Sequence, residues 1–365
     1  MNIRRVVILG LSVVVLGTTS SVLLAQRGDG ARGNTPGVNQ KEEEKRSKNQ
    51  QEDIKVITQL VTAATAAQPV SPTSTATDEQ QGDVKITWDS NHFIKGVGGV
   101  TYTPFTVVVD RAALASSNAV VYIRAVAKNP SAPAAPAEGN RQQGRATVPM
   151  YAWDDWNFVS LKEDRVSRAM MLAGGEYDLF VVVKDQFTGD KKQVAKAGML
   201  RHKLVVPDFS KTDLTTSSVL IGQIDQLPSA LPENQKRENP YTFGVLKITP
   251  NIAGKFPKSG ELALIFWIYG AGTDATTRRP NLTVEYNFYQ KNADGTEKYF
   301  NKTAPQELNA TTLPPELDVT AGLPGSMAVP MMSFPVADYR LEIKVSDKVA
   351  SKTVTHSFNF TVNPS

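Results

Sequence analysis

One strand pattern occurs twice in this chain and limits the fold more than any other feature. The segments GEYDLFVVVKD (175–185) and ADYRLEIKVSD (337–347) share a tyrosine, a leucine two places later, apolar residues at every second position and a closing aspartate. Apolar residues at alternate positions are typical of a β-strand with one face in a hydrophobic core. The pattern therefore predicts two equivalent strands in two similar β units.

Two further matches keep nearly the same spacing. The segments NAVVYIRAVAKN (118–129) and NLTVEYNFYQKN (281–292) align without gaps, 281 − 118 = 163 residues apart, and the first pair is 337 − 175 = 162 residues apart. The sequence MML before Gly174 and the sequence MMS before Pro335 add a third match. This near-constant spacing indicates a duplicated unit.

We therefore predict a mainly β chain with two tandem Ig-like antiparallel β-sandwich domains, at residues 82–224 and 238–365, joined by a Pro-rich hinge at 225–237. Short segments rich in β-branched and aromatic residues, separated by turn formers, support this assignment. Asp294–Gly295 between two such segments predicts a hairpin turn.

The N-terminus predicts export. Two arginines precede an apolar stretch at residues 6–16, which is the layout of a secretory signal peptide. We expect residues 1–25 to be a cleaved signal peptide, and the protein to be periplasmic or extracellular by the general secretory route. The alternative is an uncleaved membrane anchor, since residues 6–25 have about the length needed to span a bilayer. The hydroxyl-rich GTTSS block inside that stretch argues against the anchor.

Residues 26–81 are predicted to be a linker that is partly disordered and partly helical. Within it, apolar residues fall on one helical face: Ile54, Ile57, Leu60, Val61 and Ala64. A short docking helix and a solvated spacer with a frayed helix are both compatible with this pattern. The spacer is favoured, because the stretch is too short for the heptads of a stable coiled coil.

Charge and cysteine content exclude some functions. The chain has 365 residues, a net charge of +4 and no cysteine. Loss of residues 1–25 removes two positive charges, which leaves 4 − 2 = +2. The basic residues are scattered, so no nucleic-acid partner is expected. Without cysteine there is no thiol catalysis and no thiolate metal site.

The repeated strand also resembles a known structural feature. Its pattern around Tyr177 and Tyr339 is similar to the penultimate strand of immunoglobulin-like and fibronectin type III-like sandwiches, where a tyrosine hydrogen-bonds back to the preceding corner. The resemblance implies that both tyrosines are structural.

A broader resemblance covers residues 95–363. The segments LTVEYNFYQKNADGTEKYFNKTAPQEL and FPVADYRLEIKVSDKVASKTVTHSFNFTV resemble the C-terminal sandwich region of secreted bacterial proteins of the von Willebrand factor A-related group. This resemblance implies an exported envelope protein and supplies no catalytic residues.

No motif predicts catalysis or a cofactor. Asp208, Ser210 and Thr212 have the residue types of an A-domain metal motif, but the α/β domain that would complete such a site does not follow. The three histidines are isolated in the sequence, and His202 and His356, which fall in predicted strands, are predicted to be ordinary surface or edge residues. We therefore expect no enzyme, no cofactor and no bound metal.

One aromatic stretch stands out as a candidate binding surface. Alternation places Tyr151, Trp153 and Asp155 on one strand face and Trp156 with Phe158 on the other. One set is expected in the core. The other set is either an exposed platform for a sugar ring or an apolar partner, or is itself buried.

These observations lead to two hypotheses about function. The first is an exported, non-enzymatic binding or scaffolding protein of the bacterial cell envelope. It would recognise a protein partner through sandwich edges or through the Tyr151–Phe158 strand. The alternative is a carbohydrate-binding module, with polysaccharide as the partner and Trp153 or Trp156 as the stacking platform. Contact with a membrane is expected only through an uncleaved signal.

Overall fold

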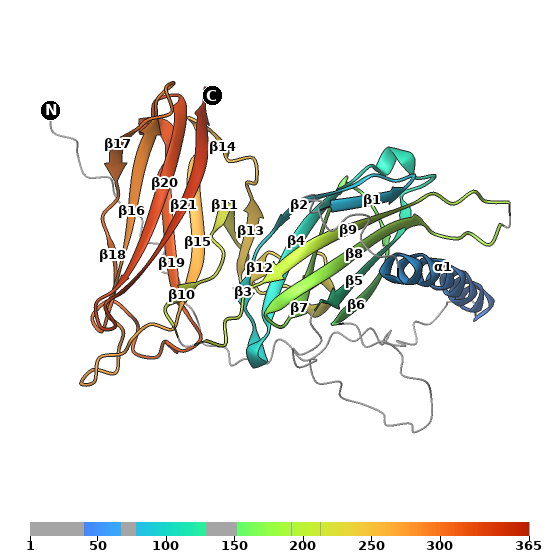
Figure 1. Cartoon of the computed structure of the whole chain (residues 1–365), viewed down its shortest axis with the longest axis horizontal. Coiled ribbons are helices and arrows are strands. Elements are labelled where there is room, and N and C mark those ends of the chain that lie inside the picture. The colour runs from blue at the N-terminus through green and yellow to red at the C-terminus, as the bar shows by residue number, and fades with distance from the viewer. Residues whose placement is uncertain (1–39, 67–77, 129–151, 191, 212, 365) are drawn as a thin grey trace.

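The chain forms two β-sandwiches with one long helix against the first (Figure 1). The computed structural model describes residues 40–66, 78–128 and 152–364, apart from residues 191 and 212. The predicted signal peptide and the Pro/Ala-rich loop before Trp153 lie outside these residues. The prediction of a mainly β protein built from β-sandwich domains is confirmed.

The first sandwich consists of two facing sheets. Sheet A contains, in spatial order, β1 (Asp78–Gly82), β9 (Ala197–Val206), β8 (Gly175–Asp185), β5 (Asn118–Ala127) and β6 (Trp153–Ser160). Sheet B contains β2 (Ile86–Asn91), β3 (Ile94–Lys95), β4 (Thr101–Val109) and β7 (Arg165–Leu172). Alternate residues of β8, such as Leu179 and Val181, are buried between the two sheets.

The second sandwich repeats this plan. Sheet C contains β10 (Thr215–Thr216), β11 (Leu220–Gln226), β12 (Thr242–Phe243), β13 (Leu246–Pro250), β15 (Glu261–Tyr269) and β19 (Leu323–Pro330). Sheet D contains β14 (Lys255–Pro257), β21 (Lys352–Asn363), β20 (Ala337–Asp347), β16 (Leu282–Lys291), β17 (Glu297–Lys302) and β18 (Gln306–Leu308). The pairing of β14 with β21 is parallel, unlike the antiparallel pairing predicted throughout.

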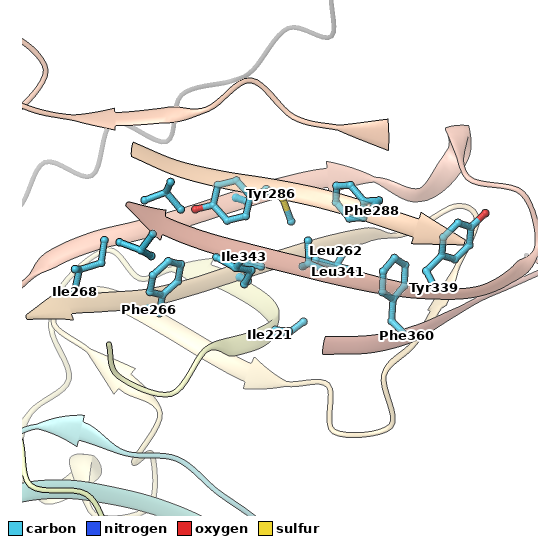
Figure 2. Close-up of a cluster of buried hydrophobic side chains, with 14 of the residues drawn as sticks. Ile221, Leu262, Phe266, Ile268, Tyr286, Phe288, Tyr339, Leu341, Ile343 and Phe360 are labelled. Atoms are coloured by element: carbon cyan, nitrogen blue, oxygen red, sulfur yellow. The ribbon is translucent and has the colours of Figure 1, made fainter. Parts of the chain in front are cut away.

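The two copies of the repeated pattern occupy equivalent positions. They form β8 and β20. Each lies between the strand that carries the second sequence match, β5 or β16, and the last strand of its sandwich, β9 or β21. Figure 2 shows Tyr339, Leu341 and Ile343 of β20 pointing into the core between the sheets. The predicted hairpin turn is also present: β16 pairs with β17, and Gly295 has the positive φ of 83° that such a turn requires.

The boundary between the sandwiches differs from the prediction. Strands β10 and β11 pair with β15 of sheet C, so the predicted boundary at residue 224 falls inside a strand of the second sandwich. The predicted hinge at 225–237 contains the end of β11 and the short helix α2 (Glu233–Lys236). Alternation in a sequence shows that a strand has a buried face, but not which sheet covers it.

The helix α1 (Gln40–Ala66) lies on the outer face of sheet A (Figure 1). Ile57 and Val61 are buried against Tyr122 and Phe180 of the sheet. The interpretation of this stretch as a solvated spacer is therefore wrong, and the docking-helix alternative is supported. The predicted linker also contains all but the last residue of β1, which pairs with β9.

An ion pair fixes the helix at its middle. The carboxylate of Asp53 lies 2.5 Å from Lys184 Nζ, and the backbone N–H of Phe187 donates to the same carboxylate at 3.0 Å. Both charged side chains are almost completely buried. Burial of two charges is tolerated only where each has a partner, so this contact specifies one position of α1 on the sheet.

Candidate functional site

The aromatic strand is β6, the edge strand of sheet A next to β5. Tyr151 lies outside the described residues. Trp153 is partly buried and packs against the core between sheets A and B. Trp156 is also partly buried, on the opposite face, where its ring lies 4.0 Å from the ring of Tyr122. Each tryptophan thus packs against a hydrophobic cluster.

Asp155 belongs to a polar cluster between the edge strands β6 and β7. Its carboxylate accepts a hydrogen bond from Asn157 Nδ2 at 3.0 Å and is paired with the guanidinium of Arg237. The amide oxygen of Asn157 accepts from Arg168 Nε at 3.0 Å. Burial lowers the pKa of Arg168, the most enclosed cation of this chain of contacts.

This polar cluster was missed from the sequence except for Asp155. Asn157 and Arg168 come from two facing strands, and Arg237 comes from the end of the predicted hinge. Arg237 also donates to the backbone oxygen of Trp156 at 2.9 Å, so it satisfies an acceptor on the outer edge of β6. The arrangement attaches the connecting segment to the first sandwich, and it does not resemble an acid/base pair.

The two predicted structural tyrosines form equivalent corners. Tyr177 donates from its hydroxyl to the backbone oxygen of Ala173 at 2.8 Å, and Tyr339 donates to the backbone oxygen of Pro335 at 2.9 Å. Both acceptors lie four residues earlier in the chain. Burial raises the pKa of Tyr339 to about 12 and also raises the pKa of Tyr177, so both hydroxyls remain protonated donors.

Two of the histidines, His202 and His92, occupy enclosed positions. His202 is buried, with its ring stacked 4.0 Å from the ring of Trp88 and its Nδ1 2.6 Å from Asp78. His92 is enclosed between the two sandwiches beside Tyr241, and burial lowers its pKa to about 4. The prediction of an ordinary surface or edge histidine is therefore wrong for His202.

The possible metal motif is a closed turn. Asp208 Oδ1 accepts from the backbone N–H and the hydroxyl of Ser210, at 2.9 and 2.6 Å. Those bonds lower the pKa of Asp208. Across the described ranges, no group of three or more His, Asp or Glu could hold a metal ion.

The region of contact between the sandwiches, which we call the joint, forms a further hydrophobic cluster outside the two cores. Buried apolar side chains from both sandwiches meet there: Ile94, Leu220, Tyr241, Ile248 and Ile265. Aromatic rings extend this cluster, with Phe243 against Tyr102 on one side and Trp267 on the other. The joint therefore resembles a protein interior more than a flexible hinge.

Hydrogen bonds close the joint around this cluster. Tyr102 donates from its hydroxyl to the backbone oxygen of Pro240 at 2.7 Å. The backbone N–H of Phe93 donates to Ser218 Oγ at 2.9 Å, and Ser218 N–H donates to the backbone oxygen of Phe93 at 2.8 Å. The backbone N–H of Lys95 donates to the Tyr269 hydroxyl at 3.2 Å. These bonds fix the sandwiches at several separate points.

Comparisons with known proteins give only distant likenesses. No family model matches the chain, and no curated protein matches it. The crystal structure of trypsin-activated alpha-2-macroglobulin from Escherichia coli is similar over 79% of this chain and 17% of that chain, with 11% identity and a TM-score of 0.21. The cryo-EM reconstruction of the native conformation of the E. coli protein is similar over 76% of this chain and 14% of that chain, with 10% identity and a TM-score of 0.20.

With TM-scores this low, these matches carry no argument about the fold or the activity of the chain. The chain spans less than a fifth of the length of either matched structure. They give no support for a relation to the von Willebrand factor A-related group. Among the helices that the structure describes, none has the length and apolar character needed to cross a membrane.

Proposed function

We propose that this protein is an exported, non-enzymatic scaffolding protein of the bacterial cell envelope, which holds a protein partner. The observation that carries the proposal is the joint. A buried aromatic cluster and several hydrogen bonds unite the two sandwiches into one stiff unit. A stiff unit presents a partner at a fixed distance and orientation, and a preformed surface binds at a lower entropic cost than a flexible one.

The exposed sheet edges are poorly suited to strand addition. Arg237 occupies an acceptor on the edge of β6. On β19, the N–H of Ser326 donates to the side-chain oxygen of Gln306, at 3.2 Å. The edge strand β17 carries exposed Lys298 and Lys302, and charged residues discourage pairing with another chain. This supports recognition through loops and corners over recognition through edges.

The carbohydrate alternative receives less support. It required a tryptophan ring open to solvent, whereas Trp153 and Trp156 are each partly buried against a hydrophobic cluster. The likeness to the von Willebrand factor A-related group stays part of the proposal, supported by strand patterns alone. It implies an exported envelope protein and brings no catalytic residues with it.

Affinity isolation from living bacteria tests this function. The full chain, tagged at its C-terminus, is expressed in bacteria, crosslinked in the cells with an amine-reactive reagent and recovered from the periplasmic and secreted fractions. We expect a reproducible protein adduct in an exported fraction. Recovery of polysaccharide alone would support the carbohydrate alternative. A protein confined to the cytoplasm, or one without any adduct, would overturn the proposal.

A further inference from the structure

The buried contact that fixes α1 brings together the two groups of an amide. Lys184 Nζ and Asp53 Oδ1 lie 2.5 Å apart, an amine beside a carboxyl group. The Lys184 side chain is 6% exposed and the Asp53 side chain is 2% exposed. The two residues are 131 positions apart in the chain, so only the folded structure brings them together. Two reactive groups held in this way behave as if each were present at a very high concentration.

The surroundings of this pair exclude water. On β5, Val120 is the cross-strand neighbour of Lys184, and on β8 Val182 lies two residues before the lysine on the same face. On α1, Ile57 follows Asp53 by one helical turn. These three apolar side chains are almost completely buried in one cluster. An apolar environment favours a neutral amine and a carboxylic acid over two separate charges, and a desolvated lysine amine is a nucleophile.

Backbone groups orient both reactants. The N–H of Phe187 donates to the Asp53 carboxyl group, 3.0 Å from Oδ2 and 3.2 Å from Oδ1. A donor in this place stabilises the negative charge that develops on oxygen when a nucleophile attacks the carboxyl carbon. The backbone oxygen of Asp185 accepts from Lys184 Nζ at 2.9 Å, which holds the amine beside the carboxyl group.

The second sandwich has no lysine at the equivalent position. The repeat aligns Lys184 and Asp185 of β8 with Ser346 and Asp347 of β20. The two aspartates have the same role, since each accepts hydrogen bonds from backbone N–H groups of nearby loops. The strand pattern therefore does not require the lysine, which occurs in the sandwich that receives α1. The chain has no cysteine, so no disulfide can attach this helix.

We propose that Lys184 and Asp53 condense to an amide that joins β8 covalently to α1. The ion pair is the state from which this bond forms. One proton passes from Nζ to Oδ1, and the lone pair of the amine attacks the carboxyl carbon. Oδ1 takes a second proton from Nζ and leaves as water, Oδ2 becomes the amide oxygen, and the third proton stays on the amide nitrogen. The step is neither an oxidation nor a reduction and consumes no further reactant. It goes beyond the proposed function and does not depend on it.

Mass spectrometry of the full chain, purified without denaturant, tests this bond. Trypsin does not cleave after an acylated lysine, so we expect a branched peptide that joins residues 49–55 to residues 169–191. Its mass should be one water below the sum of its two arms, and the intact protein should show the same loss. Lys352 and Asp213 provide an internal control, since they lie 2.6 Å apart but are exposed. We expect this second pair to remain unlinked.

The variant Lys184→Arg gives a second comparison. A guanidinium keeps a positive charge for Asp53 but stays protonated, so it does not attack the carboxyl carbon. We expect the variant to have the full mass of its sequence. In a denaturing gel the wild type should migrate faster than the variant, because the amide closes a loop between positions 131 residues apart and makes the unfolded chain more compact.

Three outcomes would overturn the inference, and none of them requires the variant to fold. A wild type of full mass, with the two arms recovered as separate peptides, would show that the contact is an ion pair only. A missing water that maps to Asp294–Gly295 would be a cyclised aspartate. Linkage of Lys352 to Asp213 in the same digest would mean that close approach alone produces the bond, so that burial does not select Lys184 and Asp53.

Discussion

At the scale of single residues, the two tyrosine corners are the clearest sign that the sandwiches repeat one design. In each, a phenol hydroxyl bonds to a backbone oxygen four residues earlier. Tyr177 and Tyr339 are almost completely buried, and a buried hydroxyl without a hydrogen-bond partner destabilises the folded state. The same bond therefore stabilises the entry to β8 and the entry to β20.

Removal of either hydroxyl should cost a similar amount of stability. Tyr177→Phe and Tyr339→Phe each lose one hydrogen bond and keep the ring, so we expect each to lower the free energy of unfolding by about 1 to 2 kcal/mol. Urea unfolding followed by fluorescence measures the change. Tyr299→Phe is the control, since that side chain is exposed. Equal stability of all three variants would show that the corners are not structural.

Protonation of His92 should make stability depend on pH. Burial lowers the pKa of His92 from its ordinary value of 6.5 to about 4 in the folded protein. At pH values between 4 and 6.5, His92 binds more protons in the unfolded chain than in the folded protein. The contribution of neutral His92 to the free energy of unfolding is therefore complete above pH 6.5 and is lost as the pH falls toward 4. The free energy of unfolding should fall by roughly 3 kcal/mol in total.

Unfolding in urea at a series of pH values between 7 and 4 measures how the free energy of unfolding changes with pH. We expect His92→Gln to make this dependence on pH weaker. His356, whose pKa burial also lowers, should account for part of the slope that remains. A curve that is identical in the wild type and the His92→Gln variant would contradict the enclosed position of His92 in the joint.

At the scale of elements, the strands were largely predictable, because alternation is a local property of the sequence. The helix was predictable too, and its buried residues Ile57 and Val61 were on the expected face. Its docking was not, because the sheet surface that receives it comes from β5, β8 and β9. The same limit applies to β11, whose alternation does not reveal its pairing with β15.

The candidate site was the least predictable part. The positions of Trp153 and Trp156 on opposite strand faces followed from alternation, but their exposure depends on what covers each face. For Trp156, Tyr122 and the docked helix were invisible in the local sequence. The polar partners of Asp155 are separated from it by up to 82 residues in the chain. No local pattern could have connected them.

The docking of α1 should depend on its buried ion pair. Asp53→Asn keeps an oxygen for the Phe187 N–H but leaves the Lys184 charge buried without a counterion, so we expect a loss of about 3 to 5 kcal/mol. Asp53→Leu/Lys184→Met removes both charges and should recover most of this loss. Urea unfolding measures both, with the exposed Glu52→Gln as the control.

Fluorescence gives an independent readout of the same contact. Trp156 packs with the cluster beneath α1, so release of the helix should move its emission to longer wavelength. If Asp53→Asn unfolds at the wild-type urea concentration, the ion pair does not hold the helix.

At the scale of the whole molecule, the joint decides whether the two sandwiches behave as one body. Interfaces between domains of one chain are commonly polar and allow relative motion. This one buries aromatic and aliphatic side chains from both sides, including Ile94 of the first sandwich and Ile265 of the second. Because the same contacts would be lost if either sandwich unfolded alone, we expect the wild type to unfold in a single transition.

A truncation at the centre of the joint tests this coupling. Tyr241 is buried between the sandwiches, where burial raises its pKa to about 12, and its ring packs at 86° to that of His92. Tyr241→Ala removes this ring from a closed site, so we expect a loss of about 3 to 5 kcal/mol, as for other large buried aromatic residues. The two sandwiches should then separate into two calorimetric transitions.

Small-angle X-ray scattering should report the same change as a larger radius of gyration for Tyr241→Ala than for the wild type. Tyr299→Ala, an exposed tyrosine in the second sandwich, should leave both measurements unchanged. A single transition and an unchanged radius in Tyr241→Ala would mean that the remaining hydrogen bonds alone hold the sandwiches together. Two transitions already present in the wild type would instead mean that the sandwiches move independently, and the scaffolding proposal would lose its main support.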